Sequence, residues 1–242
     1  MRWFTGVARR RIRSSFHEVR LSKTSAIPDS DSAVVLYGNH PSWWDPLVGL
    51  IIRDVRFPER MPFTPIDAEM LHQYGILSKI GFFGIEPSGK GARRFLRITD
   101  HLFQSSSTLL MVTPQGRFAD VRERPLELQR GLSLVAQRAP DIQFLPIALE
   151  YPFWEESKPE ILIHLGPVWR PGGMRAKEAH QRLTQSLEDA QDTLAQLSIS
   201  RDANAFDLLL RGSSSQDRSY DAWRRFRSWL RGESAEIKHG KL

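Results

Sequence analysis

The sequence predicts an α/β fold in which a mixed central sheet is flanked by helices. Its 242 residues, 40% of them apolar, are enough to bury one sizeable core. Short runs rich in β-branched and apolar residues alternate with longer stretches of helical character, an order typical of α/β proteins. The runs that we expect to form strands are 33–37, 108–113, 144–149 and 160–165.

Five further stretches have helical character. They are 46–53, 67–79, 91–104, 125–138 and 175–197. The last is polar, so we expect it at the periphery of the domain. We find no internal repeat, and SSSQDRS (213–219) has the composition of a linker. One α/β domain is therefore expected over residues 26–212.

The positive charge is concentrated at the two ends of the chain. The formal net charge is +6, and residues 1–23 alone hold seven Arg or Lys against the single acid Glu18. Residues 218–242 add seven basic residues against three acids, which leaves the body between them slightly acidic. We therefore expect a basic segment (1–25) before the domain and a basic, aromatic tail (213–242) after it.

The basic segment is expected to form an amphipathic helix. On a helical wheel, the arginines except Arg11 share one arc and the apolar side chains the other; the apolar arc holds Trp3, Phe4, Val7, Ala8, Ile12, Phe16 and Val19. The tail repeats this chemistry in DAWRRFRSWLRG. Such segments at both termini are typical of proteins that lie on an anionic lipid surface. The alternative for the first segment is a helix that packs on the core and leaves its basic face in solvent.

We expect peripheral attachment to the cytoplasmic face of a membrane. No stretch has the ~20 apolar residues that a spanning helix needs, and the N-terminus lacks the apolar segment of a secretory signal. Nucleic acid is the competing polyanionic partner, but the body carries no recognisable nucleic-acid-binding motif. We therefore expect no nucleic-acid partner.

The residue inventory excludes several kinds of chemistry. The chain has no cysteine, so disulfides, thiolate nucleophiles and cysteine zinc sites are ruled out. It has no G-x-S-x-G elbow, and its seven histidines are scattered without an HExxH pattern. We expect neither a metal ion nor a bound cofactor.

The stretch GNHPSWWDP (38–46) follows an apolar run directly and places a histidine five residues before an aspartate. Polar groups at the carboxyl end of a strand lie where α/β sheets bind ligands. A carboxylate that orients an imidazole lets it take a proton from a hydroxyl, so His40 and Asp45 are a candidate catalytic pair. The structural alternative is a helix start, with Asp45 as N-cap and Pro46 at the first helical position.

The heptapeptide from Asn39 to Asp45 resembles the NHxxxxD motif of the lysophospholipid acyltransferases, which include lysophosphatidate and glycerol-3-phosphate acyltransferases. Three further blocks follow in the order of that family; they are KIGFFGIEPSGKGARR (79–94), VTPQGRF (112–118) and FLPIALEY (144–151). The resemblance extends from about residue 30 to about residue 170.

This resemblance implies a membrane-associated O-acyltransferase of phospholipid biosynthesis, which moves a fatty acyl group from acyl-CoA or acyl carrier protein to a lipid hydroxyl. His40 would be the general base and Asp45 would orient it. Backbone N–H groups near Gly116 would stabilise the oxyanion. The residues with an implied substrate-binding role are Asn39, Lys90, Arg93, Gln115, Gly116 and Arg117.

Two departures from the family pattern concern the acceptor. Gln115 stands where the family usually has Glu, and Arg117 is displaced by one position from the family's arginine. Glu86 and Pro87 occupy the place of an arginine thought to hold the acceptor's phosphate. Family frequency favours a lysophosphatidate-like acceptor, and a neutral or glycosylated lipid is the alternative, since glutamine carries no charge. The structural alternative for Arg117 is a salt bridge to an acid such as Asp120.

Residues 84–91 allow a different interpretation. The sequence GIEPSGKG matches the GxxxxGK pattern of phosphate-binding loops, but Gly91 stands where a Ser or Thr must bind Mg²⁺. A nucleotide-binding protein therefore remains an alternative function, and a non-catalytic membrane-surface adaptor is another.

Overall fold

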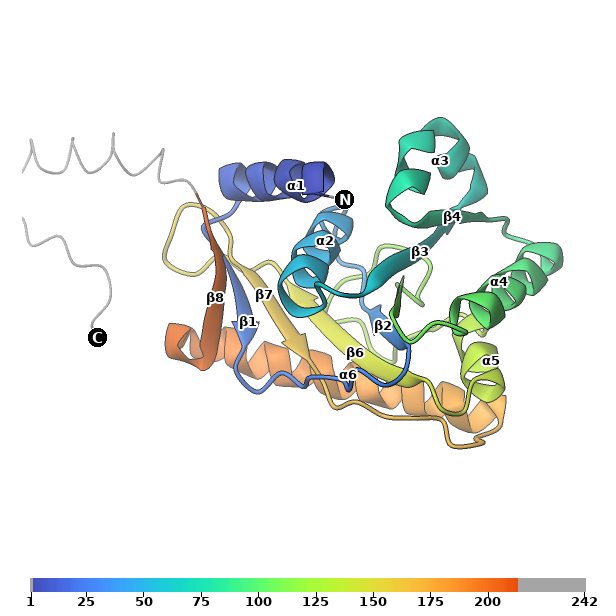
Figure 1. The fold of residues 1–242 in the computed structure, drawn as a ribbon. Coiled ribbons are helices and arrows are strands. Elements are labelled where there is room, and N and C mark those ends of the chain that lie inside the picture. Colours follow the sequence, from blue (N-terminus) through green and yellow to red (C-terminus); the bar gives the residue numbers. More distant parts are fainter. Residues whose placement is uncertain (1, 213–242) are drawn as a thin grey trace, which may run out of the picture.

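The structure is a computed structural model that describes residues 2–212, and it confirms the predicted α/β class (Figure 1). Its helices and strands follow in the order α1 (Arg2–Ser15), β1 (Glu18–Ser22), β2 (Val34–Gly38), α2 (Asp45–Arg56), β3 (Met61–Asp67), α3 (Ala68–Gln73), η1 (Gly75–Ile80), β4 (Phe82–Ile85), α4 (Gly89–Leu102), β5 (Thr108–Val112), α5 (Gly131–Arg138), β6 (Gln143–Glu150), β7 (Ile161–Leu165), α6 (Ala176–Ser200), η2 (Ala203–Ala205) and β8 (Phe206–Arg211). The elements η1 and η2 are 3₁₀ helices.

The eight strands form one mixed sheet in the order β4-β3-β5-β2-β6-β7-β1-β8. Neighbours from β4 to β6 are parallel, as are β7 and β1, while β7 is antiparallel to β6 and β8 to β1. Helices α1 and α2 cover one face of the sheet, and α6 runs along the other (Figure 1). Because β2, β5 and β6 are parallel neighbours, their carboxyl ends lie at the same edge of the sheet in this three-layer domain.

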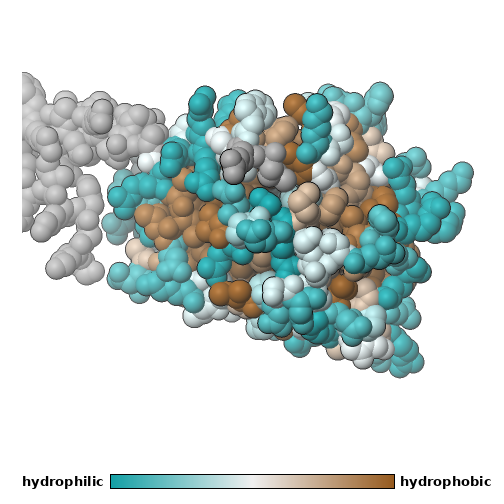
Figure 2. Space-filling model, in the orientation of Figure 1, coloured by the Kyte–Doolittle hydropathy of each residue, from teal (hydrophilic) through white to brown (hydrophobic). Residues whose placement is uncertain are grey.

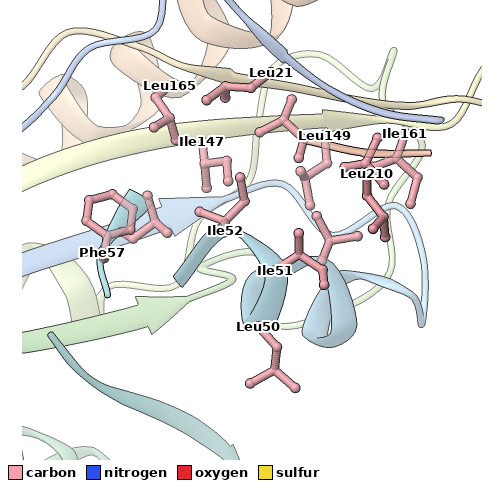
Figure 3. Packing of buried hydrophobic residues seen from close by; sticks show 14 of the residues in the cluster. Leu21, Leu50, Ile51, Ile52, Phe57, Ile147, Leu149, Ile161, Leu165 and Leu210 are labelled. Carbon is pink, nitrogen blue, oxygen red and sulfur yellow. The ribbon is translucent and has the colours of Figure 1, made fainter. Parts of the chain in front are cut away.

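Alternate residues of the central strands separate two hydrophobic cores. Val34 and Leu36 belong to the core under α1 and α2, whereas Val35 belongs to the core under α4, α5 and α6. Such alternation is what a strand buried on both faces requires. Figure 3 shows Ile51 and Ile52 of α2 directed at the sheet, while Leu50, which belongs to the same cluster, points away from the sheet.

The four predicted strands are confirmed, within two residues at each end, as β2, β5, β6 and β7. The prediction missed β1, β3, β4 and β8. Strand β3 contains Pro62 and Pro65, which normally argue against a strand, and β4 has only four residues. Pro62 and Pro65 are tolerated because β3 separates from β5 partway along its length.

Strand β3 is shared between two partners. Over Met61–Phe63 it pairs with β5, and from Thr64 onward it pairs with β4. Strand β5 continues beside β2 as far as Val112. Strands β3 and β5 thus diverge after Phe63. We call this point of divergence the fork.

The predicted membrane-surface helix over 1–25 was wrong in its extent. The helix ends at Ser15, and Glu18–Ser22 forms β1 between β7 and β8 in the sheet. The side chains of Ala8 and Ile12 are buried in the core, as in the alternative interpretation, while Trp3 is 68% exposed. The predicted tail, 213–242, lies outside the described residues. Among the helices in the described part of the chain, none combines the length and apolar character needed to cross a bilayer.

Three of the predicted helices need correction. The predicted peripheral helix is α6, and it packs against the sheet through Leu183, Leu187 and Leu194, because these residues form an apolar stripe at helical spacing. The helix predicted from 125 begins only at Gly131. Residues 67–79 form two short helices that are divided at Tyr74.

Candidate active site

A cavity of about 760 Å³ lies beside the carboxyl ends of β2 and β5. Residues 64–67 of β3 line one side of it and residues 111–114 line the other, so the cavity occupies the fork between these strands. Its wall is mostly apolar, with Leu50, Phe95 and Ile147 among the contributors. A cavity of this size and composition can enclose much of an apolar ligand.

His40 and Asp45 lie together in the cavity wall, as the sequence predicts. The distance from His40 Nδ1 to Asp45 Oδ2 is 2.5 Å. The His40 side chain is 20% exposed and that of Asp45 is 5% exposed. When Nδ1 donates to the carboxylate, Nε2 is left as a proton acceptor. The pair therefore has the arrangement of a general base and the residue that orients it.

The interpretation of Asp45 as an N-cap was wrong. Trp44 occupies the N-cap position of α2 without a side-chain cap bond, and Asp45 is the first residue of the helix. The carboxylate of Asp45 accepts hydrogen bonds from His40, from the Ser42 N–H at 3.2 Å and from the Tyr151 hydroxyl. Its place in the first turn of α2 also stabilises its negative charge.

Tyr151 is a site residue that the sequence analysis missed. It follows β6 directly, and its hydroxyl donates to Asp45 Oδ1. Burial and the adjacent carboxylate raise the pKa of Tyr151, so the hydroxyl remains a donor. The Tyr151 ring packs against Phe16, which in turn makes an edge-on contact with Trp44. The only signal in the sequence is the tyrosine at the end of the block FLPIALEY.

Asn39 positions the end of β2. Its side-chain N–H donates to the Leu149 carbonyl at 3.0 Å, and its side-chain oxygen accepts from the Leu149 N–H at 2.9 Å. Just before it, a Cβ at Gly38 would lie 2.7 Å from the Ile147 carbonyl oxygen, so this close approach to β6 requires glycine. Asn39 lines the cavity, but its amide is committed to β6 and holds His40 in place.

The third motif block contributes Gly116 to the cavity wall. Gly116 has a φ of 67°, and its N–H donates to the Thr113 carbonyl at 3.0 Å. This N–H is therefore unavailable to an oxyanion, so Gly116 itself does not supply one of the N–H groups expected near this position. Gln115 is only 3% exposed and lies outside the cavity wall; within the described residues its side-chain amide has no hydrogen-bond partner. Gln129, which the sequence analysis missed, lines the cavity next to Gly116.

Arg117 does not line the cavity. Its guanidinium forms a two-point ion pair with Glu123, in which Nη1 lies 3.1 Å from Oε2 and Nη2 contacts Oε1. Glu123 raises the pKa of Arg117. The alternative of a surface ion pair was right in kind, but its partner is Glu123, because Asp120 is paired with Arg122 at 2.7 Å.

The second motif block forms the loop between β4 and α4 and the start of α4. Ser88 caps α4 by accepting the Gly91 N–H at 3.1 Å, and Ser88 and Ala92 line the cavity. Lys90 and Arg93 are exposed and do not line it. A Cβ at Gly91 would lie 1.9 Å from the Glu86 carbonyl oxygen, so the Ser or Thr of a nucleotide-binding loop has no room here.

One cluster of potential metal ligands occurs in the described part of the chain, away from the cavity. The ligand atoms of His17, Glu18 and Glu160 lie within 4.8 Å of one another. Arg20 contacts both carboxylates, and Arg211 contacts Glu18. These arginines already balance the acidic charge, so the cluster is an ion-pair network between β1, β7 and β8.

No protein-family model matches this chain, and no curated protein matches it.

Proposed function

We propose that the protein is an O-acyltransferase that moves a fatty acyl group from a thioester, acyl-CoA or acyl carrier protein, to the hydroxyl of a lipid. The observation that carries this proposal is the His40–Asp45 pair in the wall of a largely apolar cavity. The order of the four motif blocks supports the same function.

In the proposed reaction, His40 Nε2 takes the proton of the acceptor hydroxyl as its oxygen attacks the thioester carbonyl. Asp45 stabilises the imidazolium that forms. The tetrahedral intermediate collapses, the C–S bond breaks and the thiolate receives the proton from His40. The products are an ester and a free thiol. No acyl-enzyme is needed, because the thioester is already activated.

The cavity provides a place for the acyl chain next to this pair. Leu50 and Met111 reach it from the α2 side of the sheet, and Phe95 and Leu132 reach it from the α4 and α5 side. Burying a methylene group in such surroundings contributes about 0.8 kcal/mol. Lys90 and Arg93, at the exposed start of α4, are candidates for contacts with phosphates of the donor.

We place the protein at the cytoplasmic face of a membrane, attached peripherally. Trp3 is 68% exposed on α1, the helix that also carries exposed Arg10 and Arg11, and Trp43 is 60% exposed near the cavity. This combination of aromatic and basic side chains suits an anionic lipid surface. Figure 2 shows hydrophobic residues in several separate areas of one face, divided by hydrophilic residues, so contact through a few aromatic anchors fits this face better than one broad apolar patch.

The test is thiol release from acyl-CoA in the presence of a lysolipid. We expect His40→Ala to lower turnover by ~10² to 10⁴, because the general base is lost. Asp45→Asn should also lower it, since the carboxylate no longer holds His40. The matched control is His101→Ala on the exposed end of α4, which should retain wild-type turnover.

Wild-type turnover in His40→Ala would reject the catalytic pair. Binding of ATP with Mg²⁺, without thiol release, would favour the nucleotide-binding alternative. A membrane-bound protein that releases no thiol with any acceptor would favour the adaptor.

A further inference from the structure

Apart from the candidate catalytic histidine, the ionisable side chains of the cavity wall are all acidic. Among the described residues that line the cavity there is no Lys or Arg. Besides His40 and Asp45, the ionisable groups of the wall are Asp67 and Glu86. One oxygen of Asp67 accepts the N–H groups of Glu69 and Met70 at the start of α3, so this carboxylate is held in place.

Three arginines, Arg117 in the third motif block and the next two along the chain, are neutralised within the chain. Each is paired with its own acid; the pairs are Arg117 with Glu123, Arg122 with Asp120 and Arg124 with Asp192. Arg117 is the nearest of them in sequence to the cavity, since Gly116 lines the wall. To hold a phosphate, Arg117 would first have to give up both contacts with Glu123.

The cations of α4 are directed away from the cavity. Ala92 and Phe95 define the face of α4 that lines the wall. Lys90, Arg93 and Arg94 are exposed, and at 3.6 residues per turn they lie about 130° to 170° around the helix from that face. These cations can meet an anion outside the cavity, but not one beside His40.

We propose that the acceptor presents its hydroxyl on an uncharged head group, such as the polyol or sugar of a neutral lipid, and not beside a phosphate. This inference rests on the proposed acyltransferase function. A phosphate carries −1.5 to −2 charges near neutral pH and would be repelled by the carboxylates of Asp67 and Glu86, which line the cavity but are both exposed, so salt weakens this repulsion. A neutral hydroxyl can instead donate to a carboxylate, and Gln129 adds an amide that accepts and donates.

The test compares acceptors that differ by the phosphate alone. A 1-monoacylglycerol and a lysophosphatidate with the same acyl chain are presented in micelles of a neutral detergent, and thiol release from acyl-CoA is measured. We expect kcat/KM to be at least ~10-fold higher for the monoacylglycerol, which corresponds to about 1.4 kcal/mol. A glycosylated lipid with a free sugar hydroxyl distinguishes a sugar acceptor from a glycerol acceptor.

A second comparison uses the ion pair of Arg117. Glu123→Gln frees the guanidinium without removing it, so we expect kcat/KM for lysophosphatidate to rise about 10-fold, with little change for monoacylglycerol. Glu127→Gln is the matched control, because it removes the same charge near Arg117 without breaking an ion pair. Glu86→Gln should lower the ratio of kcat/KM for monoacylglycerol to kcat/KM for lysophosphatidate, because it removes one of the repelling carboxylates.

A wild-type preference for lysophosphatidate that disappears in Arg117→Ala would overturn this inference and leave the acyltransferase function standing. Failure of the wild type to release thiol with every acceptor would overturn the proposed function, and the inference with it.

Discussion

The carboxylate of Asp45 is fixed by three groups, two from the loop between β2 and α2 and one from the end of β6. His40 follows β2, Ser42 belongs to the loop before α2, and Tyr151 follows β6. With its oxygens occupied in this way, Asp45 can hold the imidazole in a single orientation. Orientation of this kind is what a general base needs before a substrate arrives.

Tyr151→Phe is expected to lower kcat while leaving KM for both substrates nearly unchanged. Loss of one hydrogen bond to a charged group costs about 1.5–3 kcal/mol. If this whole loss destabilises the transition state, kcat falls roughly 10 to 150-fold. The measurement is steady-state kinetics well below the melting temperature.

The matched control for Tyr151 is Tyr37→Phe. Tyr37 is also buried, but its hydroxyl pairs with Trp169, away from the candidate site. This variant should lose stability and keep its kcat. An equal loss of kcat in both variants would show that Tyr151 acts only on the packing of the domain.

Sequence reasoning identified the site residues that are neighbours along the chain and missed the distant one. His40 and Asp45 are five residues apart, so their pairing follows from a single motif. Tyr151 lies 106 residues from Asp45 and reaches it because β6 pairs with β2, with Ile147 opposite Gly38. Such a register cannot be read from the sequence of one strand.

At the scale of elements, the first 23 residues form a helix and then a strand, and one helical wheel cannot tell the two apart. Ala8 and Ile12 are buried, Trp3 and Val7 are exposed, and Val19 lies in a strand. The period of two residues in β1 overlaps the end of the helical pattern, which explains why the segment resembled one long helix. Deleting residues 1–23 would remove a strand from the sheet and would therefore not be a clean test of membrane binding.

Replacement of Arg10 and Arg11 by glutamine tests membrane binding without disturbing the sheet. Both side chains are exposed on α1. Each basic residue near an anionic surface contributes about 1 kcal/mol, so we expect the double variant to bind anionic vesicles roughly 30-fold more weakly. The measurement is cosedimentation with vesicles at low salt.

The control for this prediction removes two charges on the opposite side of the sheet. Lys177 and Arg182 are exposed on α6, and their replacement by glutamine should leave vesicle binding unchanged (Figure 1). If both double variants lose binding equally, net charge rather than the face of α1 determines attachment.

The elements that the sequence predicted best are those with an uninterrupted apolar run. Strands β2, β6 and β7 are buried along most or all of their length, and their composition alone identifies them. Strand β3 was not predicted, because Pro62 and Pro65 interrupt its sequence. Helix α5 was predicted six residues too long, because buried Leu128 stands four residues before Leu132 of α5, a spacing that fits a helix, although Leu128 precedes the helix.

At the scale of the whole molecule, the sequence predicted the class of the fold but not the order of the strands. Strand β1, near the start of the chain, lies between β7 and β8, and β6 is antiparallel to β7. The pairings of β1 join segments that are far apart in the chain, and local composition carries no information about them. The cavity depends on such pairings, since it occupies the place where β3 leaves β5 for β4.

The divergence of β3 from β5 has a consequence for the dynamics of the domain. The segment from Thr64 to Ile85 continues the sheet beyond β5 only through the three residue pairs of Met61–Phe63. Near the other end of this segment, Gly81 has a φ of 95°, and a Cβ on Gly81 would lie 1.9 Å from the carbonyl oxygen of Pro62. Segments with few buried contacts open at a lower free energy than the global unfolding of a domain.

We therefore expect the amides of β4, α3 and η1 to exchange with deuterium faster than those of β2 and β6, on a timescale set by local opening. A non-reactive acyl thioester analogue that fills the fork should slow this exchange selectively, because a ligand stabilises the closed state to which it binds. Mass spectrometry of peptides from residues 64–85 is the measurement, and uniform protection across the sheet would contradict the expectation. In this view the bound chain completes the hydrophobic core at the fork, so the same molecule that reacts also closes the sheet around itself.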